Sequence, residues 1–81
     1  MSTLRVLNGS GDRRISWSIH GLAQGDVEAQ LAVREAERIF ARERELGAVA
    51  FRFRSGAPAE RMDAFDPLAD DIVLVPPMVG G

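Results

Sequence analysis

One uninterrupted helical segment, residues 27–46, constrains the fold more than any other feature of the sequence. It contains no glycine or proline, and the flanking Asp26 and Gly47 are typical of a helix N-cap and a left-handed C-cap. At about 100° per residue, its apolar side chains fall in one arc of about 140°: Ala29, Ala32, Val33, Ala36, Ile39, Phe40 and Leu46. The segment predicts one amphipathic helix, whose small alanines allow it to lie close on a sheet.

Two alternating segments before the helix predict a β-hairpin. Apolar and polar residues alternate over residues 3–7, and again where Ile15, Trp17 and Ile19 alternate with polar neighbours. Residues 8–12, Asn-Gly-Ser-Gly-Asp, have the composition of a turn, because glycine adopts positive φ and Asn and Asp bond to their own backbone. Residues 21–25 are predicted to be a loop that leads into the helix.

Shorter segments follow the helix. The larger apolar residues alternate over residues 49–53, which predicts a third strand, and residues 55–59 have the Gly/Pro composition of a turn. Residues 61–65 predict a short strand, and residues 66–70 predict a tight helical turn. Residues 72–75 are apolar on both faces, which predicts a strand in the centre of a sheet. Because Pro76 and Pro77 have no N–H to donate, the ladder must end there.

This order predicts an α+β fold, in which a mixed sheet of four or five strands packs on one long helix and the last strand lies beside the first. We expect one domain over residues 1–75 and an extended tail over residues 76–81, because 81 residues are too few for two cores. The helix side of the sheet is predicted to carry Leu4, Val6, Ile15, Trp17, Val49, Phe51, Phe53, Ile72 and Leu74.

Composition excludes several kinds of site. The chain has no cysteine, which excludes disulfides, thiolate metal sites and a cysteine nucleophile, and its one histidine cannot build a histidine-rich metal site. The net charge of −2 gives no reason to expect nucleic acid. No apolar run approaches the ~20 residues of a bilayer span, and no signal-peptide core is present. We expect a cytoplasmic protein with no catalytic residue, no metal and no membrane partner.

The tail carries a recognisable pattern. Residues 65–71, Phe-Asp-Pro-Leu-Ala-Asp-Asp, lead into the apolar strand, and a Pro-Pro pair and Gly80-Gly81 follow it. With the predicted order of elements, this pattern resembles the ubiquitin-like β-grasp family. The tail is similar to the small sulfur-carrier subunit of molybdopterin synthase and to the thiamine-pathway sulfur carrier. The body departs from these carriers in its longer helix and in residues 51–54, and is similar in topology to bacterial ubiquitin-like modifiers.

The resemblance implies that the Gly81 carboxylate is the functional group and that the chain is not an enzyme. A separate activating enzyme would adenylate this carboxylate with ATP; the chain has no phosphate-binding loop and needs no cofactor of its own. The glycines allow close backbone approach in a narrow channel, and the prolines favour an extended conformation. The residues expected to thread the channel are Pro76, Pro77, Met78, Val79 and Gly80. The alternative is that these residues are a frayed end of the chain.

Two outcomes of activation stay open. As a protein modifier, Gly81 would pass through a conjugating enzyme to an amine or hydroxyl of a target protein, with a deconjugating metallopeptidase to reverse the step. As a sulfur carrier, it would become a thiocarboxylate that a synthase uses for molybdopterin, thiamine or a related product. The tail favours the carrier. All ten basic residues are arginine, which favours the modifier because no side-chain amine could accept the carboxylate, although biased codon usage gives the same composition. We predict the modifier.

The sheet face opposite the helix is the second predicted site. It is expected to be a basic and partly apolar surface that partner proteins bind, formed by Arg5, Arg14, Arg52, Arg54, Val73 and Val75. The alternative is that charged outward positions on strands prevent aggregation.

Overall fold

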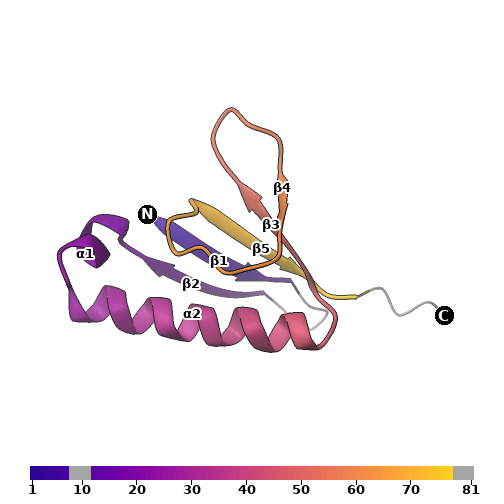
Figure 1. The fold of residues 1–81 in the computed structure, drawn as a ribbon, viewed down its shortest axis with the longest axis horizontal. Helices are drawn as coiled ribbons and strands as arrows, with labels where there is room; N and C mark the ends of the chain where they lie inside the picture. Colours follow the sequence, from indigo (N-terminus) through magenta and orange to yellow (C-terminus); the bar gives the residue numbers. More distant parts are fainter. Residues whose placement is uncertain (8–11, 78–81) are drawn as a thin grey trace.

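Five strands form one sheet, and the long helix α2 crosses one of its faces (Figure 1). The computed structural model describes residues 1–7 and 12–77. In chain order the elements are β1 (Ser2–Val6), β2 (Arg13–Trp17), α1 (Ile19–Ala23), α2 (Val27–Glu45), β3 (Val49–Phe53), β4 (Glu60–Met62) and β5 (Asp71–Val75). The predicted α+β class and the mixed sheet are therefore confirmed. In the part of the chain that these ranges cover, no helix has the length and apolar character needed to cross a membrane.

The last strand lies in the centre of the sheet. The spatial order is β2-β1-β5-β3-β4, and β5 runs parallel to β1 and antiparallel to β3. The hairpin partners β1 and β2 pair antiparallel, with Leu4 opposite Ile15. The predictions that residues 72–75 form a central strand and that the last strand pairs with the first are both confirmed.

A short helix precedes α2, where the sequence predicted a loop over residues 21–25. The Ser18 hydroxyl accepts the backbone N–H of Gly21 at 2.9 Å, which caps α1. Ile19, which the alternation placed in the second strand, is the first residue of this helix. Asp26 then caps α2, because its Oδ2 accepts the N–H of Ala29 at 3.1 Å. The capping serine was the signal in the sequence that the prediction overlooked.

The C-terminal end of α2 is a Schellman motif. The N–H of Ala48 bonds to the carbonyl oxygen of Glu43 at 2.9 Å, and the N–H of Gly47 bonds to that of Arg44 at 3.0 Å. Gly47 has φ +97°, a region that L side chains rarely adopt. The predicted helix limits and glycine C-cap are confirmed. Leu46, however, was predicted to be buried and is 63% exposed, whereas Ala48 takes the buried position at this end.

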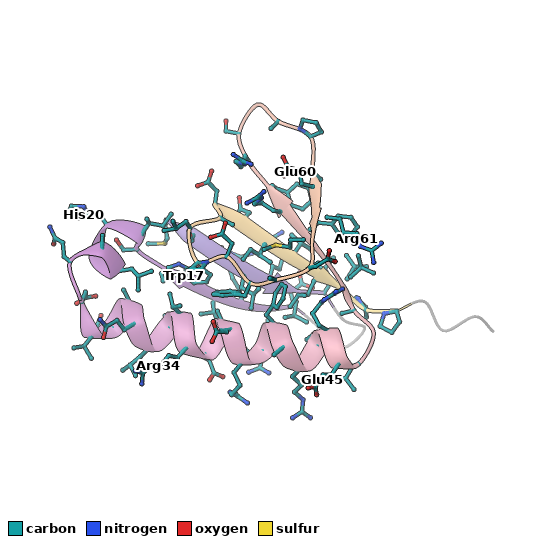
Figure 2. All side chains as sticks on the ribbon, in the orientation of Figure 1. Trp17, His20, Arg34, Glu45, Glu60 and Arg61 are labelled. Carbon is teal, nitrogen blue, oxygen red and sulfur yellow. The ribbon has the colours of Figure 1, made fainter. Side chains whose placement is uncertain are left out.

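The core lies between α2 and the helix side of the sheet. Trp17, Phe40 and Ile72 are buried there, as predicted, and Figure 2 shows Trp17 between the sheet and α2. Phe65, from the loop before β5, packs its ring 5.9 Å from that of Trp17 and 5.7 Å from that of Phe40, measured between centroids. The segment over residues 63–70 therefore closes the part of the core that the helix leaves open.

Strand β3 presents the opposite face to the one predicted. Ala50 lies opposite Leu74, and both side chains are buried. Phe51 instead lies opposite Val73 and is only partly buried. Directly opposed residues share a face of the sheet, so Val49, Phe51 and Phe53 point away from the helix. The cause is the turn before the strand: Ala48 is buried beside the Schellman motif, and alternation then carries the even-numbered residues inward.

The segment between β3 and β5 also differs in detail from its prediction. Strand β4 spans Glu60–Met62 rather than residues 61–65. The predicted helical turn at residues 66–70 is a turn in which Asp66 Oδ1 accepts the N–H of Leu68 at 2.9 Å. The carbonyl oxygen of Asp66 accepts the N–H of Ala69 at 3.2 Å. A side-chain acceptor that bonds two residues ahead stabilises such a turn without a helix.

Candidate functional site

The tail leaves the sheet from its centre. Strand β5, which has hydrogen-bonded neighbours on both sides, ends at Val75, and Pro76 and Pro77 follow it in exposed positions. Among residues 1–7 and 12–77, Leu74 is the last buried residue in chain order, so the described core ends one residue before the end of β5. The remaining predicted tail residues lie outside the described residues: Met78, Val79, Gly80 and Gly81.

Neither of the two helices in the described part of the chain lies over the face of the sheet opposite α2 (Figure 1). Strand register arranges its side chains in three rows, since directly opposed residues share a face. The central row crosses all five strands and combines three arginines with two apolar residues. We call this surface the open face. The first row, farthest from the tail, is Ser16, Thr3, Asp71 and Phe53, and the central row is Arg14, Arg5, Val73, Phe51 and Arg61. The third row, nearest the tail, is Val75 and Val49.

Four of the six residues predicted for this face lie on it. Arg5 and Arg14 are directly opposite each other on β1 and β2, and Arg5 is opposite Val73 on β5. Val75 continues β5 toward the tail. The predicted mixture of basic and apolar side chains is therefore present, and it reaches the residue after which the tail begins.

Arg52 lies on the other face of the sheet, contrary to the prediction. It is opposite Ile72, which is buried in the core. Its guanidinium donates to Glu60 at 2.8 Å and to Asp66 at 3.2 Å, and Arg54 approaches the same Glu60 carboxylate at 3.6 Å. The two arginines thus join β3 to β4 and to the loop before β5, rather than extending the open face.

This ion cluster shifts the pKa values of its members. The hydrogen bond from Arg52 lowers the pKa of the Glu60 carboxyl, and the charges of Arg52 and Arg54 lower it further. The same hydrogen bond raises the pKa of Arg52. Both shifts favour the ionised pair, so the cluster is a structural tie between strands.

Sequence reasoning missed several residues of the open face, including three hydrophobic residues of β3, Val49, Phe51 and Phe53. Phe51 and Phe53 were placed in the core, yet Phe53 is 40% exposed. Arg61 lies opposite Phe51 on β4 and was assigned no role. The burial of Ala48 sets the phase of β3, and no separate signal in the sequence indicates this burial.

The open face is hollowed at the end away from the tail. A shallow hollow of about 310 Å³ is bounded by Thr3, Arg5, Phe53, Asp71, Ile72 and Val73. Its walls offer an apolar ring beside one cationic and one anionic side chain. Such a surface suits a partner side chain that is apolar at its centre and polar at its edge.

Potential metal ligands do not cluster among residues 1–7 and 12–77. No group of three or more potential ligand side chains gathers there. His20 is exposed on the short helix α1, and Figure 2 shows it at the outer end of the molecule.

Comparison with known proteins identifies no relative. No family model, curated protein or solved structure matches this chain.

Proposed function

We propose that this chain is a ubiquitin-like β-grasp protein whose Gly81 carboxylate is adenylated by a separate activating enzyme and transferred to an acceptor, as a bacterial protein modifier. The observation that carries the proposal is the position of β5. The strand lies in the middle of the sheet, parallel to β1, and two exposed prolines follow its last residue. A tail that leaves a rigid central strand starts from a fixed point, and proline prevents it from continuing the ladder.

The open face supports the proposal as the surface for the activating enzyme. It carries Arg5, Arg14 and Arg61 around an apolar centre, although the whole chain has a net charge of −2. Complementary charge steers partners and fixes their orientation. A partner with an acidic rim and an apolar centre would therefore be guided to the face that ends at the root of the tail.

The sulfur carrier is the second candidate, and the segment before β5 favours it. Residues 65–71, followed by an apolar strand and Pro76-Pro77, resemble the tails of the sulfur carriers. The absence of lysine from the sequence favours the modifier, since the chain offers no side-chain amine to its own activated carboxylate. Both functions use the same adenylation step and differ in what attacks the adenylate.

The test is mass spectrometry of the tagged protein recovered from its native host under denaturing conditions. The tag is placed at the N-terminus, because Met1 is exposed. A modifier should be recovered in part as a chain joined through its Gly81 carboxylate to an amine or hydroxyl of another protein. A sulfur carrier should be recovered with one carboxylate oxygen replaced by sulfur. A chain that lacks Gly80 and Gly81 is the control and should give neither product.

Recovery of wild-type protein only as a free, unmodified chain would contradict the proposal. The same measurement reads the mass of the C-terminal peptide and shows directly whether Gly81 carries the free carboxylate. A product that the truncated control forms equally would exclude the diglycine as the reactive end.

A further inference from the structure

An apolar side chain is left exposed at the end of α2. Leu46 is the C-cap residue of the helix and is 63% exposed, although its position in the apolar arc predicts burial. The Schellman motif turns the chain at Gly47 and buries Ala48 instead. Leu46 therefore projects from the corner between α2 and β3 without covering the core.

The root of the tail passes this same corner. A Cβ added to Gly47 would lie 3.5 Å from Cγ of Pro77 and 3.6 Å from its Cβ, which means that the proline ring lies over the bare α-carbon of Gly47. Figure 1 shows the chain leaving β5 beside the turn that joins α2 to β3. Leu46 is thus adjacent in sequence to the residue on which the tail root rests.

A cation lies one helical turn before Leu46. The N–H of Leu46 bonds to the carbonyl oxygen of Arg42 at 3.1 Å, and residues four apart lie on the same side of a helix. Arg42 is exposed and forms no ion pair with another residue of the described ranges. The neighbouring Arg44 differs, because it donates to the carbonyl oxygen of Ala48 at 3.1 Å and approaches Asp63 at 3.5 Å.

We propose that Arg42, Leu46 and Pro77 form a docking corner for the enzyme that activates the tail. The rim of that enzyme's channel would supply an apolar pocket for Leu46 and a carboxylate for Arg42. This inference rests on the proposed function, because an enzyme that encloses the tail must close around its root. The corner belongs to the helix layer and the open face to the other side of the sheet, so the enzyme contacts both layers.

The geometry explains why the contact lies at this corner. The Pro77 ring faces Gly47, within van der Waals reach of a Cβ built there, so the end of α2 is the surface beside the tail root, and a channel that encloses the tail from its root would meet it. An exposed leucine beside an unpaired arginine is the combination that a desolvated pocket with an acidic edge recognises. A buried leucine at this position would remove the apolar contact beside Arg42.

The test is a competition between two tagged forms of the full chain in the native host. Wild type and one variant carry different N-terminal tags, and mass spectrometry measures the share of each in the adenylation-dependent product. Leu46→Ser should reduce the share of the variant about tenfold, the effect of losing one good apolar contact. Arg42→Glu should also reduce it, because the charge that meets the enzyme's carboxylate is reversed.

Matched controls come from the same chain. Leu68, in the turn before β5, is also 63% exposed, so Leu68→Ser changes the surface equally at the end of β5 away from the tail. Arg34→Glu reverses an exposed charge on α2 well before the corner, as Figure 2 shows. Both controls should keep the wild-type share, and all four variants should keep the wild-type melting temperature.

Three results would contradict the proposed docking corner. Equal competition by Leu46→Ser, with wild type forming product, would reject the corner and leave the proposed function intact. An equal loss in Leu68→Ser would show that the effect is not local to the tail root. Absence of any product from wild type would reject the proposed function and the docking corner with it.

Discussion

The indole Nε1 of Trp17 donates a hydrogen bond to the carbonyl oxygen of Pro67 at 2.9 Å, across 50 positions of sequence. This bond connects edge strand β2 to the loop that precedes central strand β5. The same loop places Phe65 against Trp17. The one tryptophan of the chain therefore holds the loop that closes the core beside α2.

Replacing this indole should destabilise the fold. In Trp17→Phe, the partly buried Pro67 carbonyl loses its donor and the smaller ring leaves a gap beside Phe65. A lost hydrogen bond and a small cavity together should lower the free energy of unfolding by about 2 kcal/mol. Urea denaturation followed by circular dichroism measures this, because the variant has no tryptophan fluorescence. An unchanged denaturation midpoint would show that the loop does not depend on this bond.

Gly47 should resist substitution because of its backbone conformation rather than for lack of space. A Cβ would meet Pro77 at 3.5 Å, which is ordinary contact, but φ is +97°. We expect Gly47→Ala to lower the free energy of unfolding by about 1–2 kcal/mol through strain in the left-handed region. Gly47→Asn should cost less, since asparagine tolerates positive φ. Equal losses in thermal unfolding would assign the cost to contact with Pro77 instead.

The tie between Glu60 and Arg52 should contribute to acid sensitivity. Arg52 holds the pKa of the Glu60 carboxyl below its ordinary value of 4.5. The Glu60 carboxyl is therefore protonated more easily in the unfolded chain than in the folded one. The stabilisation by its ion pair with Arg52 is present above pH 4.5 and is lost as pH falls through the lowered pKa of the folded state. Glu60→Gln should make the free energy of unfolding fall less steeply below pH 4.5. Denaturation series at several pH values test this, and an unchanged slope would contradict it.

The elements that the sequence predicted well are those whose signal is local. Asp26 and Gly47 set the limits of α2 through caps that involve only neighbouring backbone. The hairpin of β1 and β2 and the central position of β5 followed from alternation and from apolar residues on both faces. These features need no knowledge of distant residues, because caps and periodicity act within one element.

The predictions that were wrong concern positions where a contact between two elements decides which face of the sheet a side chain occupies. The run from Val49 to Phe53 is apolar at every position except Arg52, so either phase places hydrophobic residues on the helix side. The buried Ala48 selects the phase that buries the small Ala50, and this moves Phe51 to the open face. Arg52 then joins Glu60 and Asp66, which a pattern limited to one strand does not reveal.

Arg14 lies on the open face and Arg52 on the helix side of the sheet, so we expect charge reversal at these two positions to have different effects. Arg14 is exposed on edge strand β2 and belongs to the open face. Arg14→Glu should leave the melting temperature near that of wild type and reduce adenylation-dependent product, because the charge presented to the enzyme is reversed. Arg52→Glu should lower the melting temperature, since it places a third carboxylate beside Glu60 and Asp66. Thermal unfolding and the tagged competition measure both effects. If Arg14→Glu competes as well as wild type while remaining folded, the open face is not the surface that the activating enzyme binds.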